Sequence, residues 1–99
     1  MFEKNIKRYM TRAVADELSD EHQRFILTYI EENQKQLTDY FQIFEFYIEG
    51  NQQWLIQRQE EPERETTIFV GLKNAKPIER KVWVLDQVDH IMLLFPRDY

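Results

Sequence analysis

One serine and two histidines are the residues of this chain best suited to nucleophilic or acid–base chemistry, and there is no cysteine. Ser19 and His22 lie three residues apart, at a position typical of a helix start. A serine nucleophile needs a histidine base, an acid and an oxyanion hole, whereas a helix N-cap needs only a hydroxyl. We therefore predict that Ser19 caps a helix. The lack of cysteine excludes thiolate catalysis, disulfides and cysteine-ligated zinc.

The second histidine, His90, lies close in sequence to Asp86 and Asp89. Such a trio can ligate a divalent cation or transfer protons. The chain offers no further ligand at a recognisable spacing, and aspartates in turns commonly hydrogen-bond their own backbone. We therefore expect a solvated hairpin turn here, and we assign no catalytic, metal-binding or cofactor-binding residue.

Glu45 is a carboxylate inside an aromatic segment, between Phe44 and Phe46. Apolar surroundings can raise the pKa of an acid and prepare it for catalysis. The alternative is an ion pair with Arg58, a diagonal neighbour if the two segments form a hairpin. We favour this structural role and keep the catalytic one open.

A helix is predicted to follow Ser19 and to end near residues 34–36. Asp20 and Glu21 place negative charge in its first turn, where the exposed amides and the helix dipole favour it. Apolar or buried-type residues then recur at spacings of three and four, which marks one helical face: His22, Phe25, Ile26, Tyr29, Ile30 and Asn33. This is the only helix that the pattern predicts.

The remaining segments are typical of strands, at residues 41–48, 54–59, 66–72, 80–86 and 90–95, with a short strand or extended arm at 6–14. Gly50-Asn51 favours a two-residue hairpin loop, which places Tyr47 opposite Trp54 and Ile43 opposite Arg58. The charged, proline-containing segment 60–63 is expected to interrupt the sheet. The turn at 87–89 lacks Gly and Asn, so we expect a loop longer than two residues.

Length and composition favour one globular domain, residues 1–99, with 42% hydrophobic and 14% aromatic residues. We expect an α+β fold in which one main helix packs on a bent, mainly antiparallel sheet of about five strands. The predicted strands carry apolar side chains on both faces, and one short helix can cover only one. Either the sheet closes like a small barrel, or the second face meets another chain. The candidate interface residues are Ile43, Tyr47, Trp54 and Ile56.

The formal net charge of -5 is unevenly distributed, because residues 14–65 are acidic and both ends are mildly basic. An acidic total argues against general binding to a phosphate backbone. A local basic patch still forms if the N-terminal arm folds beside the segment 73–81. Its candidate residues are Arg8, Arg12, Arg80 and Lys81.

Several segments together resemble one family: Arg8-Tyr9-Met10-Thr11-Arg12, Gln42-Ile43-Phe44-Glu45, Gln59-Glu60-Glu61-Pro62-Glu63, and the closing Val84-Leu85-Asp86, Met92-Leu93-Leu94 and Tyr99. The chain is similar over nearly its whole length to the staphylococcal-type "domain of unknown function 960" family of small Gram-positive bacterial proteins. That family usually carries glycine where this chain has Gln87-Val88. The resemblance implies a bacterial cytoplasmic protein and supplies no site residues.

We therefore expect a non-enzymatic protein-interaction or regulatory module that self-associates or binds another protein, without a cofactor. The first thirteen residues contain no hydrophobic signal segment, and no apolar run is long enough to span a membrane, so a cytoplasmic location is expected. One alternative is a nucleic-acid-associated module that uses the basic patch. Another is a small enzyme with an unrecognised site.

Overall fold

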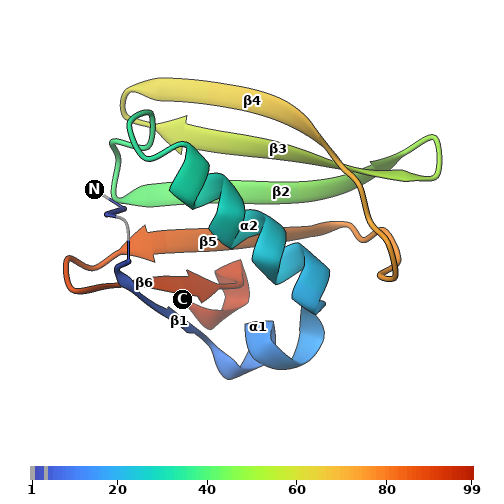
Figure 1. Ribbon diagram of the computed structural model, residues 1–99, viewed down its shortest axis with the longest axis horizontal. Helices are drawn as coiled ribbons and strands as arrows, with labels where there is room; N and C mark the ends of the chain where they lie inside the picture. Colours follow the sequence, from blue (N-terminus) through green and yellow to red (C-terminus); the bar gives the residue numbers. More distant parts are fainter. Residues whose placement is uncertain (1, 4) are drawn as a thin grey trace.

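The computed structural model describes residues 2–3 and 5–99 of the chain. Its elements follow one another (Figure 1) as β1 (Lys7–Met10), α1 (Arg12–Glu17), α2 (Asp20–Glu32), β2 (Phe41–Glu49), β3 (Gln52–Glu60), β4 (Glu63–Val70), β5 (Arg80–Asp86), β6 (His90–Leu94) and a short 3-10 turn, η1 (Pro96–Asp98).

The described strands form one six-stranded sheet in the order β1-β6-β5-β2-β3-β4. All neighbouring pairs are antiparallel except β1 and β6, which run parallel. β1 and β4 lie at opposite edges and do not pair with each other. The sheet is therefore open and does not close as a barrel.

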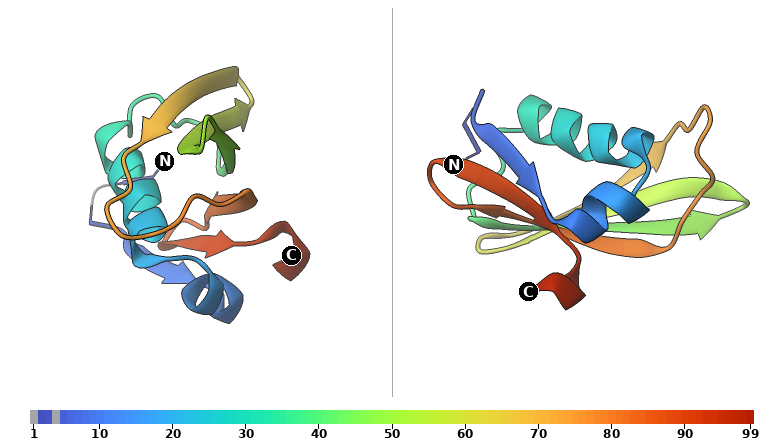
Figure 2. Two further views of the ribbon diagram at one scale, coloured as in Figure 1. Left: turned by 90° about the vertical axis from the view of Figure 1, so that its right-hand side faces the viewer. Right: turned by 90° about the horizontal axis from the view of Figure 1, so that it is seen from below.

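α2 lies on one face of this sheet, and the sheet curves around it (Figure 2). The Ser19 hydroxyl accepts a hydrogen bond from the His22 amide, and Asp20 and Glu21 occupy the first turn. The predicted N-cap is thus confirmed. The helix directs His22, Ile26, Tyr29 and Ile30 inward, so that its buried side follows the predicted periodicity.

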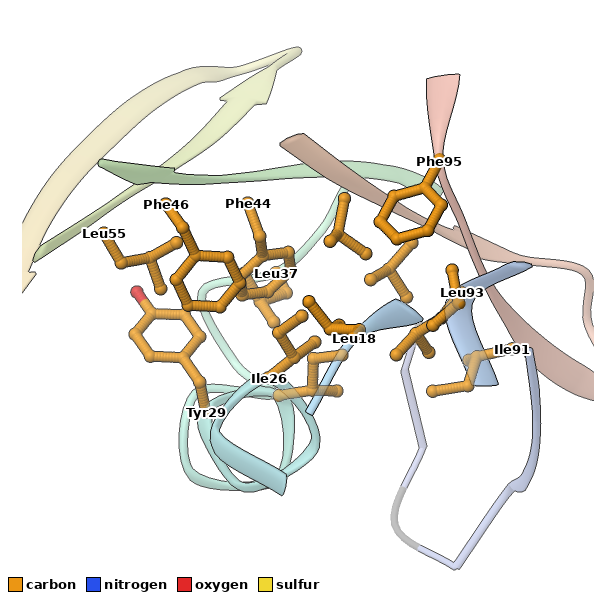
Figure 3. Packing of buried hydrophobic residues seen from close by; sticks show 14 of the residues in the cluster. Leu18, Ile26, Tyr29, Leu37, Phe44, Phe46, Leu55, Ile91, Leu93 and Phe95 are labelled. Atoms are coloured by element: carbon orange, nitrogen blue, oxygen red, sulfur yellow. The ribbon is translucent and has the colours of Figure 1, made fainter. Parts of the chain in front are cut away.

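The core fills the space between α2 and the concave face of the sheet (Figure 3). Phe44 and Phe46 of β2 lie opposite Ile26 and Tyr29 of the helix, and Leu37 lies beside them. Tyr29 meets Phe44 edge to face at 5.8 Å between ring centroids. Phe95 and Leu93 extend the same core under β1 and α1.

The β2–β3 hairpin has the predicted register. Tyr47 lies opposite Trp54, and Ile43 opposite Arg58. Gly50 and Asn51 form the loop and both adopt positive φ, at 59° and 63°. Glycine reaches this region freely and asparagine tolerates it, which is why local turn chemistry was sufficient to fix this pairing.

The expected α+β class with about five strands is wrong. The described residues are 43% strand and 23% helix, and they form a sheet-dominated fold with six strands and one main helix. The additional strand is β1, part of the predicted arm. Its four residues are too few for an alternating pattern, and its pairing with β6 is non-local.

Two local predictions also need correction. A short helix, α1, follows β1, and Thr11 caps it by accepting from the Val14 amide. The segment 60–63 does not interrupt the sheet, because β3 ends at Glu60 and β4 begins at Glu63, with a cis Glu61–Pro62 bond in the turn.

In the last hairpin, β5 ends at Asp86 and β6 begins at His90, so three residues, 87–89, form the loop. The predicted loop of more than two residues is thus confirmed. Val88 adopts a φ of 76°, and the Asp89 amide donates to the Gln87 carbonyl across it. This is the geometry of a classic γ-turn, which is rare for a β-branched residue.

Candidate functional site

The face of the sheet that is turned away from α2 carries the candidate interface, and we call it the open face. Side chains alternate along each strand, so the residues between the core positions of β2, β3, β4 and β5 point to this side. Figure 2 shows α2 on the other side of the sheet. The large apolar residues of the open face are half-buried or exposed: Phe41, Ile43, Tyr47, Trp54, Ile56, Phe69 and Trp83.

The strand register brings the four predicted interface residues together. Tyr47, Trp54 and Phe69 lie side by side across three strands, and Trp54 meets Phe69 edge to face at 5.4 Å. Ile43 and Ile56 occupy the neighbouring rows. The open face thus has an aromatic row at one end, followed by rows in which Ile56 lies opposite Glu45 and Ile43 lies opposite Arg58.

A second aromatic group lies toward β5. Trp83 is opposite Ile43, and its ring meets those of Phe41 and Tyr99 at 5.1 and 5.8 Å. Phe69 is 48% exposed although it is a phenylalanine on a regular strand. Sequence reasoning did not select Phe69 or Trp83 for the interface. The β3–β4 and β2–β5 pairings, which place them there, are tertiary information.

One ion network crosses the middle of the open face. Arg58 lies between two carboxylates, with an ion pair to Glu45 and a 3.1 Å contact from Nε to Glu65. The hydrogen bond to Glu45, followed by that to Glu65, raises the pKa of Arg58 above its ordinary value. The predicted diagonal pair is confirmed, and its charges are largely satisfied within the chain.

The candidate basic residues are not brought to one surface. Arg80 and Lys81 are consecutive in β5, so they point to opposite faces, and Lys81 lies opposite Glu45 on the open face. Arg80 instead contacts Glu17 of α1 at 3.2 Å. Arg8 pairs with Glu31, and exposed Arg12 lies 3.9 Å from Asp16.

Ser19 and His22 hydrogen-bond each other, in a chain that reaches the buried side chain of Gln53 on β3. The Gln53 amide nitrogen donates to three backbone carbonyls, so its oxygen faces His22 and must accept from Nε2 at 2.9 Å. Nδ1 lies 2.6 Å from the Ser19 hydroxyl oxygen, and the two groups share a hydrogen bond. These residues tie the helix start to the sheet, and all three are engaged in structural bonds.

The trio at the last hairpin does not converge. His90 Nδ1 lies 2.7 Å from Asp89, and this hydrogen bond lowers the pKa of Asp89. Asp86 instead accepts from the backbone amides of Phe2 and Val88, at 2.6 and 2.8 Å. No group of three potential metal ligands occurs among residues 2–3 and 5–99.

Sequence reasoning missed a set of buried glutamines on the concave face. Gln42, Gln57 and Gln59 are fully or almost fully buried and bond one another, with Gln42 Nε2 donating to Gln59 at 2.7 Å and Gln57 Nε2 donating to Gln42 at 2.6 Å. Gln59 Oε1 also accepts from the amides of Thr38 and Asp39. The signal was present, because glutamines alternate along β3 at 53, 57 and 59.

Within the described part of the chain, no helix combines the length and the apolar character that crossing a membrane requires. A comparison with curated proteins found no match. Among solved structures, a protein of unknown function from Enterococcus faecalis is similar with a TM-score of 0.86, at 17% identity, over 99% of this chain and 94% of that chain. At this identity the likeness concerns the fold alone.

A family model described as a staphylococcal protein of unknown function, DUF960, matches residues 7–98. The match includes all six strands and both α-helices, and it agrees with the resemblance found in the sequence. The chain therefore belongs to the DUF960 family.

Proposed function

We propose that this protein is a non-enzymatic interaction module of the bacterial cytoplasm that forms a homodimer through the open face. One observation carries the proposal: seven large apolar side chains lie on a sheet face that α2 does not cover. A cluster of partly exposed apolar side chains of this kind is typical of protein interfaces, and aromatic anchors dominate their binding energy.

The chemistry of the open face favours a second copy as its occupant. A two-fold contact places the same patch on both sides, which suits a surface with an apolar body and an internally paired ion network. Arg58 reaches the interface already neutralised by Glu45 and Glu65. Lys81 and the carboxylate oxygens of Glu45 and Glu65 that do not bind Arg58 remain for contacts with the second copy across the two-fold axis.

Analytical ultracentrifugation from about 1 to 500 μM tests the proposal. We expect the wild type to dimerise in this range. Ile56→Lys places a charge in the open face and should make the protein monomeric, since removing a charge from water into an apolar contact is costly.

Ile48→Lys is the matched control, because Ile48 is 40% exposed on the same hairpin and alternation directs it away from the open face. This variant should dimerise like the wild type. A wild type that stays monomeric at the highest concentration would refute the proposal. So would an Ile56→Lys variant that folds normally and retains the dimer.

A further inference from the structure

The residues that follow β6 cross to the open side of the sheet. Both views of Figure 2 show η1 on the side of the sheet opposite α2. This position brings Tyr99 against Trp83, with 5.8 Å between the ring centroids and an interplanar angle of 71°. Trp83 in turn meets Phe41 at 5.1 Å. Tyr99 therefore extends the aromatic surface of the open face beyond β5.

The side chain of Tyr99 remains almost fully accessible to water. It is 84% exposed, whereas Trp83 and Phe41 are half-buried. The edge-to-face contact with Trp83 leaves most of the tyrosine ring in solvent. Because the stabilisation from burial scales with the apolar area removed from water, this ring contributes little to the folding of a single chain.

Several polar contacts nevertheless hold η1 in place. Asp98 Oδ2 accepts hydrogen bonds from the Thr11 hydroxyl at 2.8 Å and from the Phe95 amide at 3.0 Å. Arg97 Nη2 donates to both carboxylate oxygens of Glu17, at 2.7 and 2.6 Å. These contacts, which we call the clasp, tie η1 to the start and to the last residue of α1.

The clasp orders a segment whose exposed ring gains little from the fold itself. Ordering the backbone and the side chain costs conformational entropy, which the hydrogen bonds and the ion pair of the clasp offset. A ring that is already ordered loses less entropy when it binds another molecule, so it binds more tightly than a mobile one. Tyrosine is also one of the residues that most often dominate the binding energy of an interface.

We infer that Tyr99 is a preordered anchor of the contact between two copies at the open face, and that Asp98 positions it. This inference rests on the homodimer proposed above. The occupant is the second copy because Tyr99, Trp83 and Phe41 form one line of ring contacts, so the anchor is continuous with the proposed dimer surface. In the dimer, the exposed side of the Tyr99 ring packs on apolar side chains of the second copy.

Analytical ultracentrifugation of the full chain, over the concentration range given above, tests the role of Tyr99. Tyr99→Ala removes the anchor and should raise the dissociation constant of the dimer about tenfold or more. Tyr99→Phe keeps the ring and should raise it less than about threefold, as an exposed hydroxyl contributes little. Ile48→Ala is the matched control, because it removes an exposed apolar side chain on the other face and should leave the dissociation constant unchanged.

A double-mutant cycle tests the role of Asp98. Asp98→Ala releases the clasp, so the tyrosine ring must be ordered on binding, and the dissociation constant should rise about three- to tenfold. When residue 99 is already alanine, Asp98→Ala should have no further effect on the dissociation constant, because no anchor is left to position. A merely structural role of Asp98 would change the dissociation constant equally in both backgrounds.

The outcomes separate this inference from the proposed function. A wild type that dimerises, together with a Tyr99→Ala variant that dimerises equally tightly, overturns the inference and leaves the homodimer standing. An effect of Asp98→Ala that is the same in both backgrounds also overturns it. A wild type that stays monomeric at the highest concentration refutes the proposed function and this inference with it. Because the ring is 84% exposed, Tyr99→Ala should fold like the wild type, and urea denaturation checks this.

Discussion

Replacement of Gln53 by leucine should destabilise the protein strongly, although leucine has a similar volume and is more apolar. Gln53 is 2% exposed, and its oxygen accepts from the Ile78 amide at 2.8 Å and from His22 Nε2 at 2.9 Å. The substitution leaves both donors buried without a partner, and each costs about 1–3 kcal/mol. The apolar gain of leucine offsets about 1–2 kcal/mol. We therefore expect a net loss of about 2–3 kcal/mol in the free energy of unfolding, near the middle of the range that these two terms allow.

Urea denaturation followed by tryptophan fluorescence measures this loss, because Trp54 and Trp83 report on two different strands. For a domain of this size, a net loss of this magnitude lowers Tm by roughly 10–25 °C. Gln52→Leu is the matched control, since Gln52 is the exposed neighbour on the same strand and should change stability by no more than about 0.5 kcal/mol.

The hydrogen bond between His22 and Gln53 also predicts an energetic coupling between α2 and β3. His22→Leu removes the donor that faces Gln53, so the double variant should lose about 1–2 kcal/mol less than the sum of the two single losses. A Gln53→Leu variant as stable as Gln52→Leu would refute the reasoning. Strict additivity of the two single variants would show that the contact between His22 and Gln53 contributes nothing.

Two further predictions concern the last hairpin and the segment that follows β4. Val88→Gly should raise the unfolding free energy by about 0.5–1 kcal/mol, because positive φ costs an L-residue about 1–2 kcal/mol and the added chain entropy of glycine returns part of that; Gln87→Gly, at a residue without positive φ, should lower it in the same thermal melts. Hydrogen bonds from the backbone amides of Lys73, Ala75 and Asn74 lower the pKa of Glu21 from its ordinary value of 4.5. A lowered folded-state pKa stabilises the protein above pH 4.5 and ceases to do so as the pH falls through the folded value. The stability difference between wild type and Glu21→Gln should therefore be present at pH 7 and shrink toward pH 3, and a difference independent of pH would contradict this account.

Local chemistry made several features predictable. The serine cap and the three-and-four spacing located α2, and Gly50-Asn51 fixed the β2–β3 register and with it the contact between Glu45 and Arg58. The α+β class was wrong because six strands dominate the described residues, and the strand count was wrong because residues 6–14 were indicated only as a short strand or an arm, whose pairing with β6 is non-local. The prediction of a last loop longer than two residues was correct, whereas the positive φ of Val88 was not predicted.

Of the two candidate surfaces, one could be predicted from the sequence and the other could not. Alternation within single strands already indicated that apolar side chains occupy both faces of the sheet, and Ile43, Tyr47, Trp54 and Ile56 indeed lie together. The basic patch failed to assemble because its members belong to different faces and already have acidic partners, such as Glu17 for Arg80. Neither of these facts is visible in a linear pattern.

By itself, the sequence determined the main helix, the central hairpin and the excess of apolar β surface, because periodicity and turn chemistry act between residues close in the chain. Only the tertiary structure decided the strand order, the parallel attachment of β1 and which face α2 covers. It also placed β4 at one edge of the sheet. These features arise from pairings between residues far apart in the chain, and no local pattern encodes which distant strand will lie alongside another.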